Sequence, residues 1–321
     1  MTLFKIIFIT IIFFSLTIPV LPVELVKGEY PVELHILLQL RWIDFAESHT
    51  SIHQGSNVYS GFYARRGQFK LNGSINDKKI LWNFMVDPIA LSNKILLDAF
   101  LVFSYLPYAN LKVGQFKYPQ NYEGRLPNSK LLCARFSILS KTFGAKRDLG
   151  MEVNYHHKYF EYALALINGS GQNNPENNEK KDWAAYVLAK PNSYIHFGGT
   201  IYRGRQPSGV TERNSAELRF NYKDFILQTE YQTGQDSSLE RWGLYFQSAY
   251  KIGKYFQPCV REEIWEPGKN NLKDKMFITT FGFNWFLKGE DTKIAVNYIL
   301  VTEEENEIDN NEFIIHWQLG F

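Results

Sequence analysis

A run of basic side chains between residues 118 and 146 carries the clearest chemistry of the chain. Five cationic residues stand there against one acidic residue, Glu123: Arg125, Lys130, Arg135, Lys141 and Lys146. Fixed cationic groups raise the local concentration of anions and repel cations. The composition of this segment therefore predicts anion binding.

The histidines do not form a catalytic arrangement. His156 and His157 are adjacent in a short polar stretch, and three others stand far apart in the sequence: His35, His196 and His316. None has a serine and a carboxylate at a spacing that would suggest a catalytic triad. We predict a protein that is not an enzyme and that uses no cofactor and no metal.

Length and composition restrict the class of protein. The chain has 321 residues, of which 45% are hydrophobic, with 25 Phe, 19 Tyr and two Cys. This is long for one soluble domain but ordinary for a single large β-barrel. The formal net charge of +2 lacks the basic surplus typical of nucleic-acid binding.

The first 22 residues have the features of a secretory signal peptide. Lys5 is the positive n-region, and residues 6–20 form an uncharged apolar run. The alternative is an uncleaved anchor, because this run approaches the minimum length for a transmembrane helix. We expect residues 23–321 to form one domain outside the cytoplasm. Cys133 and Cys259 could pair there, but their spacing shows nothing about proximity, and we interpret both as incidental.

The C-terminal residues form an alternating pattern. Apolar side chains occupy every second position: Phe313, Ile315, Trp317, Leu319 and Phe321. Side chains of a strand alternate between its two faces, so these five form one apolar stripe. Bacterial outer-membrane barrels usually end on such a strand. The alternative is the last strand of a soluble β-sandwich.

The same alternation recurs along the chain and predicts an all-β fold of sixteen antiparallel strands. An even number returns both termini to the periplasmic side of a transmembrane barrel. Short turns follow the even strands, and most connections after odd strands are longer, as in such barrels. The predicted strands are 33–46, 60–75, 79–87, 95–106, 110–117, 147–157, 159–168, 182–190, 193–205, 213–222, 224–233, 240–252, 255–265, 275–287, 292–302 and 312–321.

One predicted strand, 60–75, raises a difficulty. Simple alternation places six residues on its lumen face: Phe62, Ala64, Arg66, Gln68, Lys70 and Asn72. Arg65 would then face lipid, which costs roughly 2–4 kcal/mol at the middle of the bilayer. A bulge near Gly67 would turn Arg65 inward, or its side chain would reach the membrane interface.

The basic segment 118–146 is the longest connection and follows the fifth predicted strand. A ring of sixteen strands encloses a lumen wide enough for a folded loop. Apolar residues of the segment favour packing inside it: Leu126, Leu131, Leu132, Phe136, Ile138 and Leu139. We expect an infolded constriction that selects for anions. The alternative is an outer loop whose cations contact lipopolysaccharide phosphates.

Six segments carry a shared pattern: Phe62-Tyr-Ala-Arg-Arg-Gly-Gln-Phe-Lys-Leu-Asn-Gly73, Leu97-Asp-Ala-Phe100, Val113-Gly-Gln-Phe-Lys-Tyr-Pro119, Arg147-Asp-Leu-Gly150, Ile167-Asn-Gly169 and Phe281-Gly-Phe-Asn-Trp-Phe-Leu-Lys-Gly289. In their order and spacing they resemble the phosphate-selective porin O/P family. The resemblance implies a sixteen-stranded, trimeric outer-membrane channel with an anion preference.

The resemblance also implies site residues. The family's phosphate-specific members bind the anion through an arginine pair, a Ser and a Lys of the infolded loop, and an Asp, which match Arg65, Arg66, Ser129, Lys130 and Asp98. Lys70 and Arg135 complete the expected constriction. Arginine binds phosphate bidentately and lysine acts as a compact charge. Gln68 stands where those members have an aromatic residue, which favours a general anion channel over a phosphate-specific one.

Three functions remain as hypotheses. The first is a passive, anion-preferring porin, the second is a barrel enzyme such as a protease or phospholipase, and the third is a secreted soluble β-protein that binds glycans. We predict the first, in the bacterial outer membrane. Its expected partners are small anions such as phosphate, membrane lipid and lipopolysaccharide, and further copies of the chain in a homotrimer.

Overall fold

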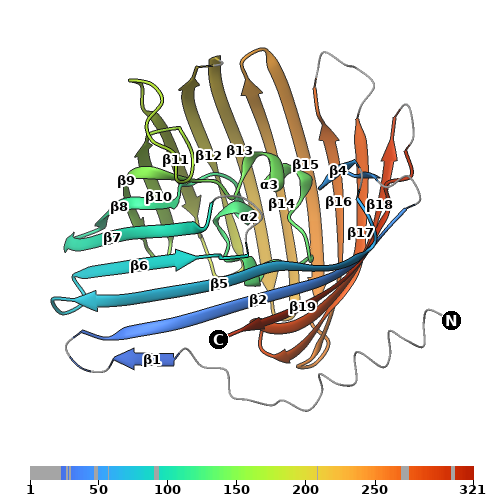
Figure 1. Cartoon of the computed structure of the whole chain (residues 1–321), viewed down its shortest axis with the longest axis horizontal. Helices are drawn as coiled ribbons and strands as arrows, with labels where there is room; N and C mark the ends of the chain where they lie inside the picture. Colours follow the sequence, from blue (N-terminus) through green and yellow to red (C-terminus); the bar gives the residue numbers. More distant parts are fainter. Residues whose placement is uncertain are drawn as a thin grey trace.

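The computed structural model describes residues 23–26, 28, 30–46, 50–56, 58–89, 94–207, 209–268, 275–304 and 308–321. The predicted signal peptide lies outside these residues. Sixteen antiparallel strands form one closed ring, in which each strand pairs with the next along the chain and β19 pairs with β2 (Figure 1). The predicted barrel is confirmed, and the alternative of a soluble sandwich is wrong because the sheet closes on itself. No helix of the described residues is long and apolar enough to cross a membrane.

Each ring strand corresponds to one predicted strand. The ring consists of β2 (Val32–Phe45), β5 (Gly61–Ile75), β6 (Ile80–Val86), β7 (Leu96–Leu106), β8 (Ala109–Lys117), β9 (Arg147–His156), β10 (Phe160–Ile167), β11 (Asp182–Ala189), β12 (Ile195–Gln206), β13 (Gly209–Tyr222), β14 (Phe225–Asp236), β15 (Leu239–Tyr250), β16 (Phe256–Glu266), β17 (Met276–Lys288), β18 (Thr292–Glu303) and β19 (Glu312–Gly320). Three short strands lie outside it. β1 (Val23–Val26) pairs with the start of β2, and β3 (Thr50–Ser51) pairs with β4 (Gly55–Ser56).

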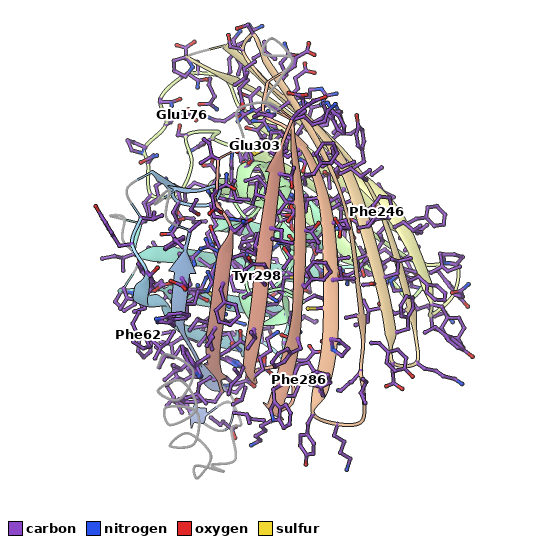
Figure 2. All side chains as sticks on the ribbon, turned by 90° about the vertical axis from the view of Figure 1, so that its right-hand side faces the viewer. Phe62, Glu176, Phe246, Phe286, Tyr298 and Glu303 are labelled. Carbon is purple, nitrogen blue, oxygen red and sulfur yellow. The ribbon has the colours of Figure 1, made fainter. Side chains whose placement is uncertain are left out.

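The two faces of the ring have opposite polarity. On β15, Phe246 and Tyr250 are exposed, whereas Tyr245 and Gln247 are buried inside. The same alternation runs through the other strands, so large apolar side chains cover the exterior and polar side chains fill the interior. Phe62 and Phe246 lie at the outer margin of the molecule (Figure 2). An apolar exterior and a polar interior match a barrel whose outer wall contacts lipid.

Short turns gather at one end of the ring. They follow β5, β7, β9, β11, β13, β15 and β17. Three consecutive residues of the β5–β6 turn, Asn76, Asp77 and Lys78, have left-handed φ values of 55°, 52° and 66°. Most connections after the other strands are longer, such as 118–146, but β12–β13 and β14–β15 are joined by two residues each, 207–208 and 237–238. This sorting of the connections agrees with the prediction from the sequence.

The ring closes through the predicted C-terminal strand. Residues Glu312–Gly320 of β19 pair in antiparallel register with residues 37–45 of β2, and Phe321 and Ile36 exchange two backbone hydrogen bonds of 2.6 and 2.9 Å. On the outside, Phe313 meets Trp42 edge-on with ring centroids 6.0 Å apart, and Trp317 stacks on Phe62 at 6.5 Å. The aromatic stripe therefore covers the seam of the barrel.

A β-bulge lies at Arg65, where β5 pairs with β2. Between β2 and β5 the register passes from Gln39–Arg66 to Leu40–Ala64, so Arg65 is the extra residue. A bulge places two residues opposite one and shifts the alternation. As a result Arg66 and Gln68 face inward as predicted, whereas the placement of Phe62 and Ala64 on the lumen face was wrong. Phe62 is 70% exposed on the exterior, and Ala64 pairs with the outward-facing Leu40.

A charge on the outer wall tests the barrel directly. Phe246 is 49% exposed near the middle of β15, so Phe246→Arg should destabilise the folded barrel by roughly 2–4 kcal/mol. Phe246→Leu at the same position should cost far less. Denaturant titration of both variants in lipid vesicles measures the difference. Equal stabilities would mean that this face does not contact lipid.

Candidate functional site

The connection between β8 and β9 folds into the lumen, as predicted for the loop after the fifth strand. It contains α2 (Tyr122–Arg125), the 3-10 helix η2 (Asn128–Lys130) and α3 (Ile138–Phe143), and α2 and α3 lie within the ring (Figure 1). The side chain of Asn121 caps α2 by accepting from Gly124 N at 2.9 Å. Ser137 Oγ caps α3 by accepting from Ser140 N at 3.1 Å. We call residues 118–146 the infolded loop.

Wall side chains bind the backbone of the infolded loop. The hydrogen bonds from β14 to β18 include Tyr122 N to Glu230 (2.9 Å), Ile138 N to Glu263 (2.7 Å), Asn284 Nδ2 to Leu132 O (2.9 Å), Lys293 Nζ to Leu131 O (2.8 Å) and Ala134 N to Asn297 (2.6 Å). A buried backbone group without a partner is costly. The polar wall therefore allows irregular backbone to lie inside the barrel.

Buried ion pairs neutralise part of the loop's positive charge. Arg135 Nη2 lies 2.7 Å from Glu312, and Arg125 pairs with Glu217. In a third case the arginine belongs to the wall and a carboxylate to the loop. Arg261 of β16 lies 2.7 Å from Glu263 of the same strand and 3.5 Å from Glu123 of the loop. Charges leave water at low cost only when they are paired. Arg125 and Arg135 thus hold the infolded loop against the wall.

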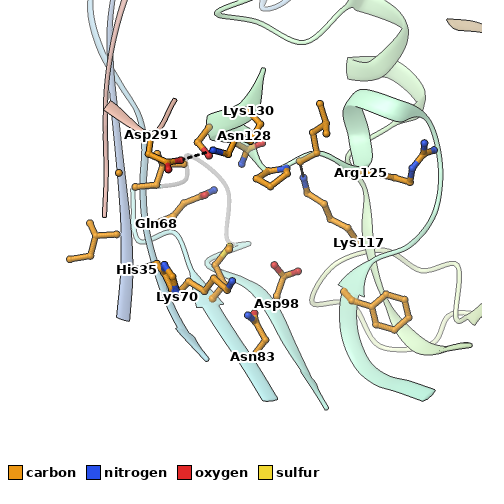
Figure 3. Close-up of a pocket in the computed structure, with 18 of the residues that line it drawn as sticks. His35, Gln68, Lys70, Asn83, Asp98, Lys117, Arg125, Asn128, Lys130 and Asp291 are labelled. Carbon is orange, nitrogen blue, oxygen red and sulfur yellow. Dashed lines mark hydrogen bonds and ion pairs between the residues drawn. The ribbon is translucent and has the colours of Figure 1, made fainter. Parts of the chain in front are cut away.

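A cavity of about 610 Å³ lies between the infolded loop and the wall formed by β2 and β5 to β9. Its lining includes Asp291 in the short β17–β18 turn and Phe321 at the C-terminus. The cavity therefore opens toward the end of the barrel that carries the short turns. Figure 3 shows Lys70, Asp98 and Lys117 around this space, with Lys130 joined to Asp291.

Basic residues dominate the charged lining of the cavity. The lining has six lysines and arginines but two aspartates, Asp98 and Asp291; the cations are Lys70, Lys112, Lys117, Arg125, Lys130 and Arg147. Most are paired. Arg147 donates two hydrogen bonds to Asp98, of 2.8 and 3.2 Å, and Lys112 lies 2.6 Å from Glu152. These pairs leave the positive potential concentrated at the remaining cations.

Two lysines of the lining have no carboxylate within ion-pair distance among the described residues. Lys117 Nζ donates to Leu126 O at 2.9 Å. Lys70 is half-buried on β5, and within the described part of the chain it has neither a hydrogen bond nor an ion pair. An ammonium group with free donors beside water is available to a passing anion.

The field around the infolded loop is uneven. Burial opposes the charge of Lys130, but Glu290 at 3.2 Å and Asp291 at 3.4 Å outweigh it and raise the pKa of Lys130. Burial and the nearby Arg135 lower the pKa of Lys141 in α3. Burial is the larger of these two causes, and the positive charge of Arg135 adds to it.

The structure divides the seven predicted site residues into two groups. Lys70, Asp98, Ser129 and Lys130 line the same cavity. The other three, Arg65, Arg66 and Arg135, are not in its lining. Arg66 is buried, donates to Gln39 at 2.8 Å and lies 5.9 Å from the ring centroid of Phe136. The arginine pair therefore does not meet Ser129 and Lys130 around one space.

Sequence reasoning missed three cations of the cavity: Lys112, Lys117 and Arg147. Lys112 and Lys117 stand five positions apart on β8, so strict alternation puts them on opposite faces. Gly114, with φ of 133°, lies between them and interrupts the regular strand. Arg147 did have a signal, because it begins one of the segments that carry the family resemblance.

Comparison with known proteins identifies the fold. No family model and no curated protein matches the sequence. Three solved structures share the architecture: DcaP, an outer-membrane channel of Acinetobacter baumannii (TM-score 0.68, 10% identity, 92% of this chain and 99% of that one), a trimer form of OmpT, an outer-membrane protein of Vibrio cholerae (0.64, 12%, 92% and 100%), and an anion-selective porin of Comamonas acidovorans (0.63, 9%, 91% and 100%).

Identities this low show the fold alone. The chain has the barrel architecture of porins over nearly its whole described length. A closed barrel with an apolar exterior also agrees with the predicted location in the bacterial outer membrane. The narrower resemblance to the phosphate-selective O/P family stays a prediction.

The Asp98–Arg147 pair provides a test of the charge in the cavity. Asp98→Asn removes one negative charge from the lining and leaves Arg147 without its carboxylate partner. The chloride-to-potassium permeability ratio should rise, on the order of fivefold if the added field is worth about 1 kcal/mol. Reversal potentials in a KCl gradient measure it. Asp224→Asn, in an exposed turn outside the cavity lining, is the control, and equal shifts in both would contradict the role of the cavity.

Proposed function

We propose that this protein is a passive, anion-preferring diffusion channel of the bacterial outer membrane. The observation that carries the proposal is the lining of the 610 Å³ cavity, where six lysines and arginines stand against two aspartates beside the infolded loop. Fixed cations in a narrow aqueous space concentrate anions and exclude cations. The sequence predicted such a constriction from the composition of the loop.

The cations divide into two roles. Arg125 and Arg135 pair with carboxylates of the wall and position the loop. Lys70 and Lys117 lack such partners among the described residues and act on the solute. This division separates the groups that maintain the pore from the groups that select its solute.

The lining suits small oxyanions such as phosphate. Besides Lys70, it offers the neutral hydrogen-bonding groups of Gln68, Asn83 and Ser129 and the planar guanidinium of Arg147. Lysine supplies a compact charge and arginine a planar fork of donors, and both suit a tetrahedral oxyanion. Because Arg147 already donates a hydrogen bond of 2.8 Å to Asp98, some of its N–H donors are not available to an anion. We therefore favour a weak, general anion preference over tight phosphate specificity.

Arg65 and Arg66 belong to the proposal as sources of positive potential, whereas Arg135 is paired with Glu312 and positions the loop. Arg66 and Arg41 line a second, much smaller space, together with His316 and residues of the infolded loop. These buried guanidinium groups add positive potential along the path without contacting a solute in the larger cavity. We propose a homotrimer as the assembly, because one structure of similar fold is a trimer. Outer-membrane lipid and lipopolysaccharide would surround the part of the wall that the trimer leaves exposed.

Reversing the charge of Lys70 tests the proposal. Lys70→Glu places a carboxylate in the cavity and breaks no ion pair of the described residues. Anion preference should fall severalfold or reverse, because two unit charges change near the solute path. Reversal potentials of the purified protein in planar bilayers measure this.

The matched control is Lys254→Glu, which makes the same charge change in an exposed turn between β15 and β16. It should leave the permeability ratio near that of the unaltered protein. Added phosphate should reduce the chloride current of the unaltered channel more than that of Lys70→Glu. Unchanged selectivity in Lys70→Glu would refute an anion-selecting role for this cavity.

A further inference from the structure

The two cysteines, far apart in the sequence, meet inside the barrel. Cys133 lies in the infolded loop between η2 and α3, and Cys259 lies on β16. Both are free thiols in the structure and are 2% and 7% exposed. They pack together with Ala249 in one buried cluster, and Leu132 packs against it. Spacing along the chain gives no sign of this proximity.

The wall holds the backbone on both sides of Cys133. Asn284 Nδ2 donates to Leu132 O at 2.9 Å, and Ala134 N donates to Asn297 at 2.6 Å. The thiol of Cys259 itself donates to Leu132 O at 3.7 Å. The segment that carries Cys133 is therefore fixed against the wall from three strands, β16, β17 and β18. The two cysteine side chains thus pack against each other from a loop and a strand that are held together, and such proximity is the first requirement of a disulfide.

We propose that Cys133 and Cys259 form a disulfide that ties the infolded loop to the barrel wall in the exported protein. The inference rests on the proposed outer-membrane function, because disulfides form and persist in oxidising compartments such as the periplasm. It assigns a covalent modification to two residues that the channel mechanism does not use.

The reaction requires an oxidant of the protein disulfide class, namely a periplasmic thiol–disulfide oxidoreductase. One cysteine thiolate attacks a sulfur of the oxidant's disulfide and forms a mixed disulfide, and the other thiolate then displaces the oxidant. The two cysteines lose two protons and two electrons, and the oxidant's disulfide becomes a dithiol. Since both thiols are buried in the finished barrel, this exchange precedes the final seating of the loop.

Cys133 is placed to act as the first nucleophile. It belongs to a connection and not to a barrel strand, so it can reach an oxidant before the loop is in place. Its thiolate is the form that attacks the oxidant's disulfide.

The bond would restrict the loop that forms the constriction. Hydrogen bonds and ion pairs can each open transiently, whereas a cross-link removes the conformations in which the loop leaves the wall. The cation positions around the cavity, above all Lys130 in η2 and Arg125 in α2, would then stay constant during conduction.

The state of the thiols can be measured directly. Full-length protein from outer membranes is quenched in acid, denatured, alkylated with a maleimide and examined by peptide mass spectrometry. We expect no alkylated cysteine before reduction, two after reduction, and one linked peptide that contains Cys133 and Cys259. In Cys133→Ser or Cys259→Ser the remaining cysteine should be alkylated without reduction. Two alkylated thiols in unreduced wild-type protein would overturn the inference.

A second measurement separates this inference from the channel proposal. Current records of wild-type protein should show few brief closures, and the records of Cys133→Ser/Cys259→Ser should show several times more. Prior reduction should change only the wild type. Free thiols in a conducting outer-membrane barrel refute the disulfide and leave the channel. A disulfide between the two cysteines in a barrel that does not conduct refutes the channel and leaves the disulfide. An equal frequency of brief closures in the wild type and in Cys133→Ser/Cys259→Ser refutes the effect of the disulfide on the loop.

Discussion

The pairing of β19 with β2 is the constraint on which the rest of the structure depends. A strand edge in lipid would leave a row of backbone donors and acceptors without partners, and no water is present there to satisfy them. Nine residue pairs from Phe45–Glu312 to Leu37–Gly320 remove that edge. Once the ring is closed, alternation alone sends every second side chain into the lumen. The apolar exterior and the polar interior are two results of the same closure.

The polar interior then determines what the lumen can contain. Glu230, Glu263 and Asn297 would be costly inside a soluble protein, but here they bind backbone groups of the infolded loop. Arg261 is fully buried and lies between a wall carboxylate and a loop carboxylate. The polar groups of the loop and of this part of the wall therefore satisfy each other, and the cavity remains between the loop and the wall formed by β2 and β5 to β9.

The strands and the infolded loop were accessible to sequence reasoning because they depend on local patterns. Period-two alternation located sixteen strands, and the parity of the turns placed the long connection on the side from which it folds inward. The bulge at Arg65 was anticipated from the cost of an arginine in lipid, although its exact position changed the faces of Phe62 and Ala64. The cost of placing Arg65 in lipid thus indicated the bulge that period-two alternation alone did not predict.

The candidate site was less accessible. Composition pointed to the cations of the infolded loop, and the resemblance added Arg65, Arg66 and Asp98. Which of these share a space depends on how the loop crosses the lumen: Lys70, Asp98, Ser129 and Lys130 meet, whereas Arg66 and Arg135 are engaged elsewhere by Gln39 and Glu312. Pairing likewise separates Lys70 from the neutralised cations around it.

By itself, the sequence determined the class of fold, the number of strands, the polarity of the two faces and the basic character of the loop. Each of these follows from the residue type at a given position and from its near neighbours. Only the tertiary structure decided which charges are paired, which cations face the cavity, and that Cys133 lies against Cys259. Those outcomes depend on contacts between residues far apart in the chain, and the period of a strand carries no information about them.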